Sequence, residues 1–381
     1  MTAPMSAPPA LPRRTWSFLV IVAVGVAGTV ATYFARLPTG ARGYYNRGVA
    51  DSREGRLDSA IRNLDHALEL EPERFDAHIA RGMTWLRAGR PYAALTDADA
   101  ALKVAPTAVR AHYLRGLAWL RAGREDQALA SFRHAVEADP GFGRAVVATG
   151  DLAFDRGRPD DALEAYRRAC ALRHDDDAMH YVPMLVWATR LLAGDRTGAE
   201  SELRELIRKR PLDRFRLASW VDAATRVTRG AAPARGEEGV VLAWTEGVRD
   251  LAAGDRAGAV GHFRRAIAEG APDSWAGDRA RAMLESVTVG FRVALENREI
   301  SSSFSFGPGV EVTCVRADGP AARAGITEGD RLVRIGGADA SSEGVDAVVT
   351  REAVGRELAL QLFQRGRPID VALVVGGGPP R

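Results

Sequence analysis

The feature that most constrains this chain is a pattern of small residues that recurs every 34 residues between Ala41 and Asp176. Two glycine columns and two alanine columns keep this step through four units, and prolines close the first three units. The columns are Gly48, Gly82, Gly116 and Gly150; Gly55, Gly89, Gly123 and Gly157; Ala60, Ala94, Ala128 and Ala162; Ala67, Ala101, Ala135 and Ala169; and Pro72, Pro106 and Pro140. A fixed period of this length predicts a repeat array.

Each unit is predicted to be a pair of antiparallel helices. In the first unit, one helix reaches a turn at Gly55, and a second helix carries Ala60, Leu64, Ala67 and Leu68 at spacings of three and four. Small residues at the crossing points are expected to let the two backbones approach each other. A single pair leaves apolar surface exposed, so neighbouring units must stack into a continuous core.

These small residues resemble those of the tetratricopeptide repeat (TPR), whose pattern falls where Gly48, Ala60, Ala67 and Pro72 stand. The resemblance covers residues 41–176 as four units and implies an all-α superhelix. The sequence departs from the family at two kinds of position. Arginine stands where the family usually has leucine, at Arg47, Arg81 and Arg115. Asp51 stands where an aromatic residue would match Trp85 and Trp119.

The pattern continues in weaker form after the fourth unit. Residues 177–228 are predicted to hold a degenerate fifth unit and a helix, and residues 229–239 a flexible loop. The repeat phase returns in residues 240–286, which we interpret as a further unit followed by a closing helix.

The first helices of the TPR family line the inner face of the superhelix, and this resemblance implies a groove here. An apolar groove of this kind favours a helix or extended segment of a partner protein, although a later helix of the same chain could also pack there. Arginines at Arg42, Arg53, Arg87 and Arg121 are expected at its rim. The implied groove residues are Tyr45, Val49, Ile79, Met83, Leu86, Tyr113, Leu117 and Leu120, with Met184 and Leu191 further along.

From Val287 the apolar residues alternate, which predicts a small β domain. Residues 319–330, Gly-Pro-Ala-Ala-Arg-Ala-Gly-Ile-Thr-Glu-Gly-Asp, are followed by Ile335-Gly-Gly. This run resembles the PDZ domain in its bacterial, periplasmic-protease form, and the resemblance covers residues 287–375. It implies a turn of helix from Pro320 to Ala324 and a strand after Asp330.

The PDZ resemblance also implies a peptide site. Thr288-Val289-Gly290-Phe291 fits the loop that precedes the ligand-binding strand, where backbone N–H groups of Gly290 and Phe291 would hold a terminal carboxylate. A peptide would then add as a strand to the edge formed by Phe291, Val293 and Leu295. Val345, Val348 and Val349 on the following helix would form the side-chain pocket. The alternative is an ordinary strand in a domain used only for docking.

The N-terminal region predicts a membrane anchor. Residues 1–15 are expected to be a disordered tail, as are residues 376–381. Residues 16–35 carry no charge, and their length matches the ~20 residues that cross a bilayer as a helix. A cleaved signal peptide or a buried helix are the alternatives. A short tail before a large C-terminal part suggests a bacterial inner-membrane protein with its domains on the periplasmic side, although arginines flank both ends of the span.

The sequence offers no candidate active site. It lacks the zinc-protease, nucleophile-elbow and phosphate-loop motifs, and the histidines recur in repeat columns, as at His66 and His134 or His78 and His112. Its net charge of +3 arises from 52 basic and 49 acidic residues, a mixture that does not point to nucleic acid. We therefore expect no enzyme activity, no cofactor, no metal and no small-molecule substrate.

These observations together predict a membrane-anchored adaptor that binds protein segments in the groove and peptide C-termini at the PDZ-like site. Two weak sites on one chain would retain a partner that either site alone would release. One alternative is a regulator that presents substrates to, or restrains, a separate membrane or periplasmic protease. Another is a structural subunit of a membrane-associated assembly.

Overall fold

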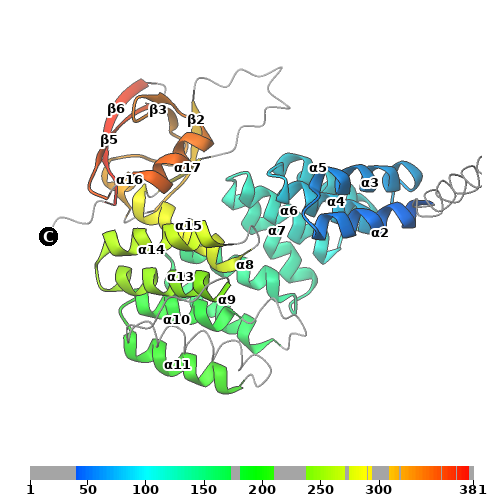
Figure 1. Cartoon of the computed structure of the whole chain (residues 1–381), viewed down its shortest axis with the longest axis horizontal. Helices are drawn as coiled ribbons and strands as arrows, with labels where there is room; N and C mark the ends of the chain where they lie inside the picture. The colour runs from blue at the N-terminus through cyan, green and yellow to red at the C-terminus, as the bar shows by residue number, and fades with distance from the viewer. Residues whose placement is uncertain are drawn as a thin grey trace, which may run out of the picture.

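The computed structural model describes residues 40–172, 181–209, 237–270, 274–289, 291–293, 309–316, 319–352, 354–365 and 367–376. These residues form a helical superhelix followed by a small β domain (Figure 1). The predicted membrane span, the N-terminal tail, residues 377–381 of the C-terminal tail, the helix expected near residues 214–227 and most of the loop expected at 229–239 lie outside the described residues. Gly376, the first residue of the predicted C-terminal tail, is described and hydrogen bonded. Among those described, no helix is both long and apolar enough to cross a bilayer.

The 34-residue units fold as four consecutive helix pairs. Each predicted turn glycine follows the first helix of its pair and adopts a positive φ, 78° at Gly55 and 75° at Gly123, which suits a residue without a Cβ atom. The pairs are α2 (Gly40–Arg53) with α3 (Leu57–Leu70), α4 (Phe75–Arg87) with α5 (Pro91–Val104), α6 (Val109–Arg121) with α7 (Glu125–Ala138), and α8 (Gly143–Asp155) with α9 (Pro159–Ala171).

The superhelix continues beyond these pairs. The further helices are α10 (Val182–Leu192), α11 (Arg196–Lys209), α13 (Glu237–Ala252), α14 (Arg256–Glu269) and α15 (Trp275–Thr288). The helix α13 begins at Glu237, three residues before the point at which the sequence analysis ended the loop, and α15 runs two residues past the expected closing helix.

Two glycines of the column on the first helices make room for large rings of the second helices. A Cβ atom added to Gly116 would lie 2.4 Å from Cε1 of Phe132, and one added to Gly150 would lie 2.7 Å from Cε1 of Tyr166. Both rings are almost fully buried. The sequence pattern predicted a close approach of the two backbones at these glycines. The structure shows that they also form the socket for a buried ring.

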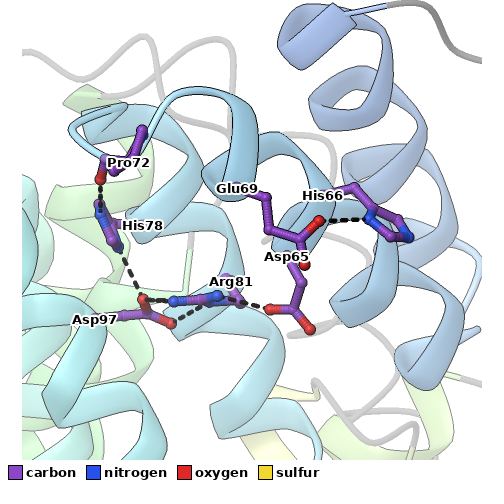
Figure 2. A network of polar contacts seen from close by, with 7 residues as sticks. All are labelled: Asp65, His66, Glu69, Pro72, His78, Arg81 and Asp97. Carbon is purple, nitrogen blue, oxygen red and sulfur yellow. Dashed lines mark hydrogen bonds and ion pairs between the residues drawn. The ribbon is translucent and has the colours of Figure 1, made fainter.

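Arg81, one of the arginines that depart from the TPR pattern, joins neighbouring units. Arg81 donates to Asp97 on its own second helix, at 2.9 Å and 2.7 Å, and to Asp65 on the preceding second helix, at 2.6 Å (Figure 2). His78 lies beside this network, with Nδ1 2.9 Å from Asp97 and Nε2 2.8 Å from the Pro72 carbonyl oxygen. Asp97 is only 2% exposed, and these donors satisfy its buried carboxylate oxygens.

Asp51, the other departure, is also buried and hydrogen bonded. It accepts from Ser59 at 2.7 Å, from Asn63 at 2.9 Å and from Nε of Arg56 at 3.1 Å. Burial alone raises the pKa of this carboxyl, but the hydrogen bonds from Ser59, Arg56 and Asn63 outweigh it and hold the pKa below its ordinary value. The aspartate thus fixes the first turn by polar contacts, where Trp85 and Trp119 use apolar surface in the next two units.

The C-terminal domain is a six-stranded antiparallel sheet with two helices. The strands β1, β2, β3, β5 and β6 follow one another across the sheet, and β4 pairs with β3. Its elements are β1 (Phe291–Val293), β2 (Val310–Val315), α16 (Pro320–Arg323), β3 (Arg331–Ile335), β4 (Ala338–Asp339), α17 (Ser342–Arg351), β5 (Glu357–Gln364) and β6 (Arg367–Val374). The predicted turn of helix at Pro320 and the strand after Asp330 are both present.

The superhelix and the β domain share one apolar core. A single cluster of buried side chains runs from Val146 on α8 through Leu284 on α15 to Val349 on α17 and Leu362 on β5. Figure 1 shows α15 between the sheet and the helices α8 and α13. Because α15 belongs to both parts, the β domain is held on the superhelix by packing as well as by its chain connection.

Candidate functional site

Most of the residues predicted to line the groove are at least partly accessible along the first three repeats. Tyr45, Val49, Leu86, Tyr113, Leu117 and Leu120 are partly exposed, Met83 is 36% exposed, and Ile79 is buried at 4%. The arginines expected at its rim, Arg42, Arg53, Arg87 and Arg121, are all exposed. The guanidinium of Arg74 also lies 5.0 Å from the centre of the Tyr45 ring. An accessible apolar strip with cationic edges is a surface suited to a protein segment.

The later part of the groove is closed. Met184 and Leu191, which the sequence analysis placed on the groove surface, are only 2% and 8% exposed and belong to the shared core. Both lie on α10, which packs against α9, α11 and the later helix α13, and just before α10 the ring of Tyr181 stacks on Trp275 of α15 with a centroid separation of 4.7 Å. Packing against a later helix of the same chain, the alternative left open by the sequence, therefore describes this part.

A buried charge cluster fixes α15 in this position. The Nη2 atom of Arg279 lies 3.1 Å from Asp155, and Nη1 lies 3.5 Å from Asp151, which also accepts from the Tyr166 hydroxyl at 2.7 Å. The guanidinium carbon lies 5.1 Å from the centre of the Phe154 ring. Burial alone lowers the pKa of Arg279, but Asp155 and Asp151 outweigh it and raise the pKa. Sequence reasoning missed this cluster because α15 lies outside the repeat period.

The second surface is the edge of the sheet at β1. This strand ends the sheet order and pairs antiparallel with β2, with Phe291 opposite Val315 and Arg292 opposite Cys314. In the described residues, its other edge has no strand beside it. Gly290 and Leu295, two residues of the predicted peptide site, lie outside the described part, and the structure places only the backbone of Phe291 and Val293.

The segment that leads into β1 is anchored by backbone hydrogen bonds. The N–H of Gly376, after β6, donates to the Thr288 carbonyl oxygen at 2.9 Å, and the N–H of Ala321 on α16 donates to that of Val289 at 3.1 Å. The Val289 side chain is fully buried. The signature run of residues 319–330 therefore holds Val289, the residue before the predicted carboxylate-binding N–H groups, through α16.

Three arginines from three elements surround this end of α15. Arg256 on α14 donates to the Gly376 carbonyl oxygen at 3.0 Å, Arg316 after β2 contacts the hydroxyl of Ser286, and Arg323 lies on α16. Burial lowers the pKa of Arg256, and the charges of Arg323 and Arg316 lower it further. Positive charge at a helix C-terminus complements the helix dipole and favours an anionic group nearby.

The predicted pocket valines lie on α17 and are buried. Val345 and Val348 are 6% and 9% exposed, and Val349 is fully buried in the shared core. Arg264 of α14 donates to the carbonyl oxygens of Val349 and Glu352, at 3.2 Å and 2.5 Å, and so caps the C-terminus of this helix. The last helical repeat thus fixes the helix that would form one wall of a peptide site.

A metal site is not evident at either surface. Within the described ranges, no group of three or more histidine, cysteine or carboxylate side chains lies close enough to hold a metal ion. The described histidines contact nearby residues of the helical units. His66, for example, has its Nδ1 atom 2.9 Å from the Glu69 carboxylate on the same helix (Figure 2).

Comparison with known proteins identifies both parts. A sequence model of the tetratricopeptide repeat matches residues 45–98, 86–141 and 126–178, and one of the PDZ domain matches residues 311–360. The chain therefore contains TPR repeats and a PDZ domain, two kinds of module that point to protein interaction rather than catalysis. No curated protein matches the sequence.

Several solved structures are similar to part of the chain. They include the MamA protein, at 20% identity over 44% of this chain and 91% of that one, with a TM-score of 0.38. A thermophilic TPR protein of Thermus thermophilus is 20% identical over 47% of this chain and 98% of that one, with a TM-score of 0.39. MamA from residue 41 onward, of Desulfovibrio magneticus RS-1, is 23% identical over 44% of this chain and 93% of that one, with a TM-score of 0.37.

Proposed function

We propose that this protein is a membrane-anchored adaptor that holds partner proteins at two surfaces of one body. The open groove of the first three repeats would bind a partner segment, and the β1 edge of the PDZ domain would bind a peptide C-terminus. The observation that carries the proposal is the apolar core that continues from α8 to α17, because it holds the PDZ domain on the repeat array that also carries the groove residues. A partner that fits both surfaces gains from the high effective concentration of the second contact.

At the PDZ surface, the peptide would add to β1 as a further antiparallel or parallel strand, and backbone hydrogen bonds would supply affinity. The backbone N–H groups of Gly290 and Phe291 would hold the terminal carboxylate. The field of Arg256, Arg316 and Arg323 favours a negative charge at this end of the strand. Val345 and Val348, each slightly exposed, would contact the last side chain of the peptide.

Residues 16–35 would anchor the protein in a bacterial inner membrane, with both interaction domains on the periplasmic side, as for the periplasmic-protease form of PDZ domain. This placement is tested by protease protection in intact and lysed spheroplasts. We expect digestion of the repeat and PDZ domains in intact spheroplasts. Digestion only after lysis would put these domains in the cytoplasm.

The peptide site is tested with the full chain in mild detergent and an array of C-terminal octapeptides, each made as a free acid and as an amide. We expect the free acids with apolar last residues to bind and their amides not to bind. Gly290→Asp should abolish this binding, because its carboxylate would occupy the anion site. Gly261→Asp on α14, where an added Cβ atom has no neighbour within 4 Å, is the matched control and should bind normally.

Equal binding of acids and amides would overturn the carboxylate site, and so would normal binding by Gly290→Asp. Loss of the natural partners from a pull-down in the presence of an excess of the bound free acid would support peptide capture as the function. Retention of those partners would favour the structural-subunit alternative, in which the PDZ domain is buried in an assembly.

A further inference from the structure

The charge of the groove changes sign between the third and the fourth repeat. At the thirteenth position of the first helix, counted so that Gly48 is the eighth, the first three units carry Arg53, Arg87 and Arg121, and the fourth carries Asp155. At the ninth position, apolar Val49, Met83 and Leu117 give way to Asp151. The groove is therefore apolar and basic in one half and acidic in the other.

The acidic half already holds a helix of this chain. The helix α15 lies against α8 and inserts Arg279 between Asp151 and Asp155, where the arginine is only 8% exposed. The chain thus places a helix in its own groove and matches a basic side chain to acidic groove positions. This intramolecular contact shows which kind of segment the inner face accepts and how charge selects it.

Where the two halves meet, α15 also makes a pair with the charges reversed, an acidic side chain of the helix beside a basic side chain of the groove. Asp278, the residue before Arg279 on α15, lies 3.9 Å from Arg121, the last arginine of the basic column. Both side chains are more than half exposed, so the pair adds little stability. It does place a carboxylate of a groove-bound helix at one of the three rim arginines.

The basic half has the charge to bind an acidic segment. The helices α2, α4 and α6 carry eight arginines and two aspartates. Arg81 already pairs with Asp65 and Asp97 of the second helices, and one of the two aspartates, Asp51, is buried against Arg56. The other, Asp76, pairs with Arg110 at 3.2 Å. The apolar strip formed by Val49, Met83 and Leu117 runs between these charges and is accessible.

We propose that the open half of the groove binds an amphipathic helix of a partner protein that carries an apolar stripe flanked by Asp and Glu. The proposal rests on the proposed function and names the partner chemistry of its groove. The apolar stripe would cover the strip along Val49, Met83 and Leu117. Carboxylates of the helix would face Arg53 and Arg87, in the way that Asp278 already faces Arg121.

The test uses the full chain in mild detergent and two fluorescein-labelled peptides of about 18 residues, roughly five helical turns. One peptide has leucines at spacings of three and four with glutamates on both flanks, and the other has lysine in place of every glutamate. We expect the glutamate peptide to bind tightly and the lysine peptide weakly. The preference should shrink as salt is raised, because the rim charges are exposed.

The variant Arg53→Glu/Arg87→Glu should lower the affinity for the glutamate peptide by about tenfold at low salt. Each exposed ion pair contributes a few-fold to the affinity, and charge reversal adds repulsion. The variant should also bind the lysine peptide more tightly than the wild type does. The control Arg62→Glu/Arg133→Glu makes the same charge change at two exposed sites on second helices and should leave both affinities unchanged. Met83→Gln should weaken both peptides several-fold, since it removes apolar contact without reversing a charge.

Equal affinity for the two peptides would overturn the charge assignment and leave the groove as a binding surface. Failure of both peptides to bind, while free-acid octapeptides still bind at β1, would overturn the groove in both proposals. If neither peptide binds the wild type and Arg53→Glu/Arg87→Glu changes the oligomeric state, the groove would be an interface with a second copy of this chain. That result would also overturn the proposal.

Discussion

The fit between the glycine column and the buried rings can be tested with one pair of substitutions. Gly116→Ala places a Cβ atom 2.4 Å from Cε1, 2.5 Å from Cδ1 and 3.0 Å from Cζ of Phe132. These distances are too short for carbon atoms, so either the ring or the helix must move. The Phe132 ring is fully buried and also packs on the Tyr113 ring, with 5.8 Å between the ring centres, which limits its movement.

The magnitude follows from two opposing effects. Overpacking of a filled core costs about 1–3 kcal/mol. Replacing glycine by alanine inside a helix raises the free energy of unfolding by up to about 1 kcal/mol. We therefore expect Gly116→Ala to lower the free energy of unfolding by up to about 2 kcal/mol. At Gly261 on α14 no atom lies within 4 Å of an added Cβ, so Gly261→Ala should raise it by up to about 1 kcal/mol.

The assay is urea denaturation followed by circular dichroism, combined with hydrogen exchange at the amides of α6 and α7, because repeat arrays need not unfold in one step. Exchange should accelerate in these two helices in Gly116→Ala and not in Gly261→Ala. A second change, Phe132→Leu, should relieve part of the strain in Gly116→Ala. Equal stabilisation by the two alanines would refute the idea that the glycines are sockets for buried rings.

Three further predictions concern polar contacts. Arg279→Met should lower the free energy of unfolding by about 1–3 kcal/mol, because two half-buried carboxylates lose an ion-pair partner, and adding Asp151→Asn and Asp155→Asn should recover part of the loss. The folded-state pKa of Asp51 is depressed, so its contribution is present above the unfolded pKa and is lost as the pH falls through the folded value. The acid-induced loss of stability should therefore be smaller in Asp51→Asn. Arg264→Met should speed hydrogen exchange in α17 and cost about 1–3 kcal/mol, as measured by urea denaturation, while an unchanged α17 would contradict the capping role.

The periodic part of this fold could be predicted from the sequence because each repeat carries its own local signals. The spacing from Gly48 to Gly150 places four helix pairs, and the signature run ending at Asp330 places α16 and β3. In the structure Asp330 is buried and accepts from Thr327 and Gln364, so the signature preserves a turn.

Contacts between distant segments could not be predicted in the same way. Arg81 appeared as a departure from the family, and its role in joining Asp65 to Asp97 becomes visible only when the second helices are placed side by side. The closing helix was predicted, but its packing against α8 was missed because the helix follows no period. Met184 was assigned to the groove surface, although α10 packs against α13 and buries it. A signal was present in Asp151 and Asp155, which interrupt apolar and basic columns of the repeat.

The central claim, that this chain presents two surfaces to other proteins, is tested most directly by site-specific photo-cross-linking in native membranes. A photoreactive residue is placed at Met83 in the groove, at Arg292 on the β1 edge, or at exposed Arg133 on a second helix. The account predicts adducts with other proteins at Met83 and Arg292 and none at Arg133, with the adducts identified by mass spectrometry. Adducts formed only within the chain itself at both surfaces, or no adducts at either, would contradict it.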